Sequence, residues 1–167
     1  MNMKAISLLE PWASLVAVGA KRIETRSWPT NYRGLLAIHA SKSRRPMHMD
    51  LASGEPFRSA LQPIRKVIEV RGENKIALRY HFGCVIAICR LVDCLYIGPT
   101  YLSEYYDGKT CGKKLPLPTG DELVFGNYTP GRFAWILKGV IRLPEPIPAK
   151  GWRRLWNWEV PEGVCLP

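Results

Sequence analysis

The sequence predicts an α+β fold in which a small, partly closed β-barrel carries helices on its outside. Three features predict it: short apolar segments between turn residues, one short helix near the N-terminus, and a polar insertion at about residues 43–82. A chain of 167 residues suits one domain that buries about 70% of its unfolded surface. We therefore expect a single domain over residues 1–167.

The N-terminal segment predicts a strand followed by a short helix. Residues 3–9 alternate enough to form a half-buried strand. Pro11 favours a first helical position, Glu10 is a candidate cap, and Gly19 ends the pattern. Apolar side chains recur at helical spacing between them, at Trp12, Leu15 and Val16.

A second extended segment follows the helix and carries charges on one face. Ile23 and Thr25 point one way, and Glu24 and Arg26 point the other way, with Lys21 just before them. One interpretation is a surface ion-pair cluster, and exposed pairs contribute only about 0–1 kcal/mol.

The neighbouring residues favour a cleft over a solvated surface. Trp12 and Trp28 flank the charged segment, and residues 33–40 are apolar on both faces, which predicts a central strand. His39 lies inside that strand, where a lone histidine is most often a core residue with satisfied hydrogen bonds. Charges held among such elements lose part of their solvent, so we expect them to line a cleft.

The second half of the chain predicts further strands and one long loop. Residues 83–94 are the most apolar run and are too short to span a bilayer, which indicates a buried strand. Residues 132–137 and 140–143 predict two more strands. Turn residues dominate about 97–121, which predicts a long loop with one short helix near 102–106.

The insertion is predicted to be helical in at least two pieces. Five side chains keep helical spacing, namely Leu61, Ile64, Val67, Ile68 and Arg71. Nine basic residues between Lys42 and Arg79 stand against four acidic ones. Either the insertion is simply solvated, or it forms a rim over the cleft that contacts phosphates.

The tail at residues 150–158 is dense in tryptophan and arginine. Such residues can stack on bases, or they can plug the end of a barrel. We expect the plugging role for Trp156 and Trp158.

The charge of the chain favours a polyanionic partner. Its formal net charge is +10 and its isoelectric point is near 9.6. Such a surface attracts nucleic acids or anionic lipids. We expect nucleic acid and no membrane attachment, because no long apolar run or basic amphipathic helix is present in the sequence.

The cysteines predict free thiols in a reducing compartment. The chain has an odd number of them, Cys84, Cys89, Cys94, Cys111 and Cys165, with no C-x-x-C pair. We find no signal peptide, so we expect a cytoplasmic protein. A strand would send Cys84 and Cys89 to opposite faces, so we expect no metal site.

The charged segment resembles the G-x-K-x-x-E-x-R signature of the ASCH domain family, through Gly19, Lys21, Glu24 and Arg26. Residues 7–15, 32–42 and 125–135 resemble further blocks of that family. The resemblance implies a PUA-like β-barrel with a cleft for a nucleic acid or nucleoside. Glu10 departs from the family, in which many relatives carry Gln before Pro-Trp.

The resemblance and the pattern together define a predicted nucleic-acid site, whose members are Lys21, Glu24, Arg26, Trp12, Trp28, Ser41 and Lys42. We expect Lys21 to contact a phosphate or a base carbonyl and Glu24 to accept hydrogen bonds from a base edge. Arg26 would bind phosphate or orient Glu24. The two tryptophans would lie on either side of the base. Ser41 and Lys42 would extend the surface that binds the anionic backbone.

Three functions are compatible with these residues. The first is a module that binds RNA or another single-stranded nucleic acid, including a modified or splayed base. The second is a hydrolase that acts on a modified nucleoside or on RNA; the resemblance includes relatives that cleave acetylated cytidine with this Lys and a Thr three residues later. Glu24 replaces that Thr here, so an enzyme would use Lys21 and Glu24 as an acid–base pair without a cofactor. The third is a protein-interaction module, because an ASCH domain occurs in a transcription coactivator complex.

Overall fold

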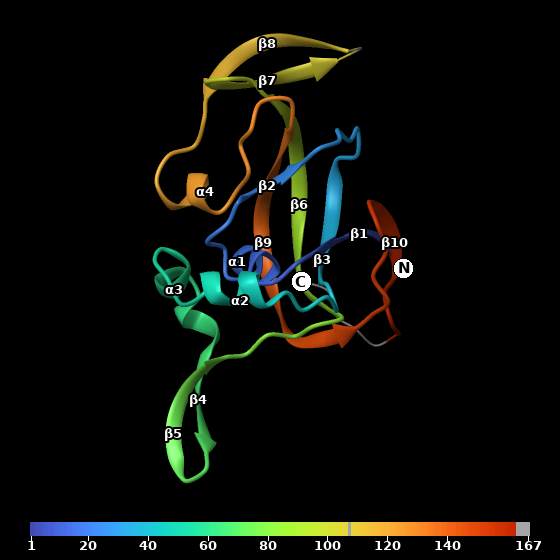
Figure 1. The fold of residues 1–167 in the computed structure, drawn as a ribbon. Coiled ribbons are helices and arrows are strands. Elements are labelled where there is room, and N and C mark those ends of the chain that lie inside the picture. The colour runs from blue at the N-terminus through green and yellow to red at the C-terminus, as the bar shows by residue number, and fades with distance from the viewer. Residues whose placement is uncertain (107, 163–167) are drawn as a thin grey trace.

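The computed structural model describes residues 1–106 and 108–162, which form one large curled sheet with short helices beside it (Figure 1). The strands of the large sheet are β1 (Asn2–Leu8), β2 (Ile23–Arg26), β3 (Gly34–Ala40), β6 (Cys84–Ile97), β7 (Tyr101–Tyr106), β8 (Lys109–Pro116), β9 (Phe133–Pro148) and β10 (Leu155–Glu159). They run in the order β10-β1-β3-β6-β7-β8, and β9 joins β6 to β2. The mostly β, half-barrel shape agrees with the predicted α+β class.

The core lies where β3, β6 and β9 pack against the first helix. As predicted, β3 is central: it pairs with β1 in parallel and with β6 antiparallel. Helix α1 (Trp12–Ala17) begins one residue after Pro11 and buries Val16 against this sheet. Trp135 on β9 is fully buried in the same cluster.

The insertion corrects one of our predictions. It begins with three short helical pieces, α2 (Pro46–Leu51), α3 (Phe57–Ala60) and the 3-10 helix η1 (Gln62–Ile64). The prediction of a helix that continues to Arg71 is wrong. Strands β4 (Arg65–Val70) and β5 (Glu73–Leu78) form a hairpin there instead. Arg71 and Gly72 both have positive φ, 54° and 79°, as a two-residue hairpin turn requires. β-branched side chains mimic helical spacing here but prefer a strand.

The expected long loop is also largely a hairpin. Strands β7 and β8 pair with each other, and β7 continues the large sheet next to β6. The short helix predicted near residues 102–106 is therefore wrong. Leu102 is buried while Tyr105 stacks on Tyr96 with ring centroids 5.7 Å apart, so cross-strand packing decides the conformation. The remaining helix is α4 (Asp121–Val124).

The cysteines that the structure describes are free thiols. These are Cys84, Cys89, Cys94 and Cys111, whereas Cys165 lies outside the described residues. Within residues 1–106 and 108–162, no cluster of three His, Cys, Asp or Glu side chains could hold a metal ion. In the same part of the chain, no helix has the length and apolar character needed to cross a bilayer.

Candidate nucleic-acid interface

The structure brings Lys21, Glu24 and Arg26 together at the start of β2. The chain turns back after α1 because Gly19 adopts a φ of 79° and the Lys21 N–H donates to the Leu15 carbonyl at 3.0 Å. Lys21 Nζ lies 3.6 Å from Glu24 Oε2, and Arg26 Nε lies 3.1 Å from Glu24 Oε1. Glu24 therefore lies between two cations on one face of the strand.

Lys21 is a buried ammonium group, with only 1% of the residue exposed. It donates a hydrogen bond to the Ile23 carbonyl. Burial lowers the pKa of Lys21, and the negative charges of Glu24 and Glu122 oppose that shift. Glu122 also accepts hydrogen bonds from the backbone N–H groups of Arg22 and Ile23, at 2.8 and 3.0 Å, which holds the start of β2 in place.

Glu24 and Lys21 line a small cavity of about 250 Å³ together with Trp12. The opposite wall is formed by residues 124–127, at the end of α4. Trp12 is held by edge-to-face contacts with His48 and Phe57, with ring centroids 4.8 and 6.5 Å apart. The small cavity therefore combines a fixed aromatic wall with a buried carboxylate and an ammonium group.

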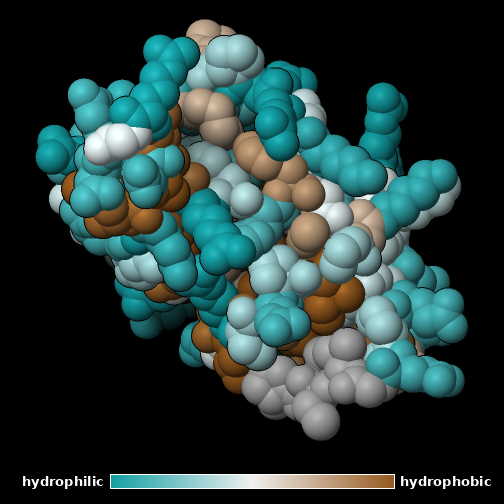
Figure 2. Space-filling view, turned by 90° about the horizontal axis from the view of Figure 1, so that it is seen from below, coloured by the Kyte–Doolittle hydropathy of each residue, from teal (hydrophilic) through white to brown (hydrophobic). Residues whose placement is uncertain are grey.

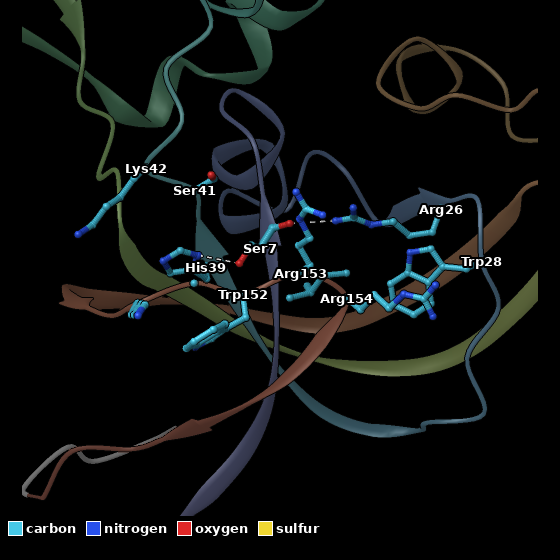
Figure 3. A pocket seen from close by; sticks show the side chains of 12 residues that line it. Ser7, Arg26, Trp28, His39, Ser41, Lys42, Trp152, Arg153 and Arg154 are labelled. Carbon is cyan, nitrogen blue, oxygen red and sulfur yellow. Dashed lines mark hydrogen bonds between the residues drawn. The ribbon is translucent and has the colours of Figure 1, made fainter.

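The other four predicted residues line a second, larger cavity of about 880 Å³ (Figure 3). These are Arg26, Trp28, Ser41 and Lys42. Our prediction placed all seven residues in one cleft, whereas the structure divides them between two. Arg26 joins the two cavities, because its Nε pairs with Glu24 and its Nη2 donates to the Ser7 carbonyl at 3.0 Å.

The large cavity also contains residues that sequence reasoning did not assign to the site. Its remaining lining is formed by Ile6, Ser7, His39, Lys150, Gly151, Trp152, Arg153 and Arg154. The density of tryptophan and arginine in the tail was the sequence signal that could have identified Trp152, Arg153 and Arg154. Trp156 and Trp158 are buried as predicted, while Trp152 is 57% exposed at the cavity.

His39 and Ser7 form the floor of the large cavity (Figure 3). His39 Nε2 lies 3.1 Å from the Ala149 carbonyl and must donate to it, so Nδ1 accepts from the Ser7 hydroxyl at 3.0 Å. Burial lowers the pKa of His39, which keeps the ring neutral. This agrees with the predicted satisfied core histidine. A Cβ on Gly151 would come within 2.3 Å of the His39 ring, so only glycine fits there.

The walls of the large cavity are strongly basic. Five cations line it, Arg26, Lys42, Lys150, Arg153 and Arg154, and no carboxylate is found among its described lining residues. Lys150 lies over the Trp152 ring at 4.6 Å, and Arg154 lies over the Trp28 ring at 5.7 Å. Such a cavity can neutralise an anion and offers aromatic faces to a planar group.

The chain is thus a small, basic, mostly β domain whose charged residues line two polar cavities. The model of the ASCH domain family matches residues 6–147, and the chain belongs to this family. The family predicted from the charged signature is thereby confirmed.

Two relatives are similar to this chain over 91 residues. Activating signal cointegrator 1 of Mus musculus is 36% identical over that stretch, and the Homo sapiens protein of the same name is 35% identical. The matched stretch is 54% of this chain but only 14% of the length of each relative.

Proposed function

We propose that this domain binds single-stranded nucleic acid, RNA above all, across its two cavities. The observation that carries the proposal is the large cavity, with five cations, two tryptophans and no acidic residue among its described lining. Cationic grooves with aromatic faces suit single strands, because phosphates and unstacked bases are recognised together.

In this proposal the large cavity holds the sugar–phosphate backbone. Arg153 and Lys150 contact phosphates. Lys42, at the far end of the cavity, extends this row of cations (Figure 3). Bases stack on Trp28 and Trp152. They displace Arg154 and Lys150, which cover those two rings in the free domain. Each stacked base would contribute on the order of 1–3 kcal/mol.

The small cavity would recognise one base. Glu24 is 9% exposed, and a carboxylate has about four lone-pair sites, so it can accept from a base edge while Lys21 and Arg26 hold it. Trp12 supplies the neighbouring wall. A base bound there would lie next to the part of the sugar–phosphate backbone that Arg26 contacts.

Hydrolysis of a modified nucleoside is the second function that we consider. It is favoured by the contact of 3.6 Å between the Lys21 ammonium and the Glu24 carboxylate inside the small cavity. Glu24 would activate a water molecule, and Lys21 would stabilise the developing negative charge. Turnover of acetylated cytidine that disappears in Glu24→Gln would support this function, and absence of turnover would exclude it for that substrate.

Binding is tested with a labelled single-stranded RNA at several salt concentrations. Lys150→Gln with Arg153→Gln removes two cations from the large cavity. We expect weaker binding and a salt slope reduced by about 1.4, since each phosphate contact on a single strand contributes about 0.7. The matched control is Lys109→Gln with Lys113→Gln on β8, which should bind normally. Equal binding by both variants would contradict the proposal and favour a protein-interaction module.

A further inference from the structure

We infer that the β4–β5 hairpin is a second nucleic-acid contact surface, onto which a strand leaving the large cavity continues. This inference rests on the proposed function and extends it: the ligand is a single strand longer than the cavity can hold. The two cavities together would supply base recognition and stacking, and the hairpin would supply affinity that does not depend on sequence.

The hairpin projects from the body of the domain (Figure 1). Its two strands pair only with each other, with Val67 opposite Ile76. It is anchored at its base, where Leu78 packs on a buried cluster and Arg65 Nη2 donates to the Ala52 carbonyl at 3.2 Å. Six residues per strand give it a length of about 20 Å.

The hairpin carries a clear excess of positive charge. Residues 65–79 include five cations, Arg65, Lys66, Arg71, Lys75 and Arg79, and two carboxylates, Glu69 and Glu73. Lys75 pairs with Glu73 at 3.5 Å, while Lys66 and Arg71 have no ion pair with any described residue. Lys66 and Arg71 are therefore available to a polyanion, and Lys75 can join them because its exposed pair with Glu73 is weak.

Basic residues connect the hairpin to the large cavity. The chain leaving β5 runs along the lower side of the domain to the end of β3 (Figure 1), where the Gly83 N–H donates to the Ala40 carbonyl at 2.7 Å. The side chain of Lys42, which lines the cavity, lies so close to Gly83 that a Cβ there would come within 2.7 Å of it. A positive track therefore starts at the rim of the cavity.

The track continues from Lys42 toward the hairpin. Arg44 lies over the Phe82 ring at 4.6 Å. Arg79 follows β5 directly, and its N–H donates to the Ile64 carbonyl at 3.0 Å. Burial lowers the pKa of the nearby His81, and the positive charges of Arg79 and Arg142 lower it further. Figure 2 views the domain from the side on which the hairpin projects, and hydrophilic side chains cover much of that face. Arg44 beside Phe82 and Arg79 at the end of β5 thus place positive charge on the segment between the cavity and the hairpin.

The chemistry of the hairpin favours phosphates as its ligand. No aromatic residue occurs between positions 65 and 79, so the hairpin has no ring on which a base can stack. Lys66 pairs with Ala77 and Lys75 pairs with Ile68, two positions further along the ladder. Because every second position of a strand faces the same way, Lys66 and Lys75 point to the same face. Flexible ammonium groups in this arrangement act as point charges for a backbone rather than as readers of base edges.

The inference is tested with two RNAs, one of about 4 nucleotides that fits the cavity and one of about 15 nucleotides. The test variant is Lys66→Gln with Arg71→Asn and Lys75→Gln, in which Asn tolerates the positive φ of position 71. The matched control removes three cations at the opposite hairpin, by Lys109→Gln, Lys113→Gln and Lys114→Gln. Thermal unfolding of every variant verifies that the fold is intact.

We expect the test variant to bind the short RNA like the original chain. Its salt slope with the long RNA should fall by about 2, for three lost phosphate contacts, and its affinity for the long RNA should approach that for the short one. Glu69→Gln with Glu73→Gln should instead tighten binding of the long RNA only.

Two outcomes would overturn the inference: unchanged binding of the long RNA, or equal losses for both lengths. Failure of the proposed function looks different, because the cavity variant Lys150→Gln with Arg153→Gln would then bind both RNAs normally. If the original chain prefers a long RNA whose extension is double-stranded, the hairpin is a duplex contact and the single-strand inference is wrong.

Discussion

Glu10 is a buried acid whose neutral form suits its surroundings. The residue is 1% exposed, and its carboxyl group accepts hydrogen bonds from the Ser14 N–H and the Ser14 hydroxyl, both at 3.0 Å. Burial raises the pKa of Glu10 from 4.5 to about 7, although the bonds from Ser14 favour the charged form. We therefore predict that Glu10→Gln makes the domain more stable at alkaline pH.

The magnitude follows from the two pKa values. Between pH 4.5 and 7 the folded chain holds a proton that the unfolded chain has released, so stability falls as pH rises through this range. Each pH unit corresponds to about 1.4 kcal/mol, and the full cost above pH 7 is therefore about 3 kcal/mol. The glutamine side chain of the variant would imitate the protonated acid, with its carbonyl accepting from the Ser14 N–H and its amide donating to the hydroxyl.

The assay is urea unfolding of both proteins at pH 5 and pH 8. We expect the advantage of Glu10→Gln to grow by about 2–3 kcal/mol between the two pH values, or by about 5–10 °C in Tm for a chain of this size. Other titrating groups affect both proteins equally and cancel in the difference. The same difference in unfolding free energy at both pH values would refute a raised pKa for Glu10.

Two further predictions concern the large cavity. Gly151→Ala should lower the free energy of unfolding by about 1–3 kcal/mol, because its Cβ would lie 2.3 Å from His39 and 2.7 Å from Ser7 Oγ. Gly54→Ala, whose nearest neighbour lies at 3.8 Å, is the matched control, and equal urea midpoints for the two variants would disprove the close contact. Trp152→Ala should weaken RNA binding by about 1–3 kcal/mol at unchanged Tm, since this side chain is 57% exposed. A Trp152→Ala variant that binds RNA as tightly as the original chain would remove this tryptophan from the interface.

Local sequence patterns predicted the elements that carry the charged cluster. The helical spacing that ends at Gly19 predicted α1, and the alternation that follows placed Glu24 and Arg26 on one face of β2. The apolar run in β3 predicted a central strand. Each of these depends on neighbours a few residues apart, so the sequence itself contains the necessary information.

The patterns were less informative where two periodicities overlap. Val67, Ile68 and Arg71 fit a helix by spacing, yet the chain forms a hairpin. Arg71 and Gly72 adopt a turn with positive φ, and this turn joins β5 to β4, which is rich in β-branched residues. Tyr105 was likewise expected in a helix but packs across strands on Tyr96. In both places, pairing between strands outweighed the local preference.

Only the tertiary structure decided how the two cavities of the candidate site are assembled. Strand pairing places Ser7 beside His39, and the His39 bond to the Ala149 carbonyl brings the tail segment with Arg153 over the cavity, more than 100 residues away in sequence. The division into two cavities around Arg26 arises in the same way. Sheet register and long-range packing determine these contacts, and neither can be read from residues that are adjacent in the chain.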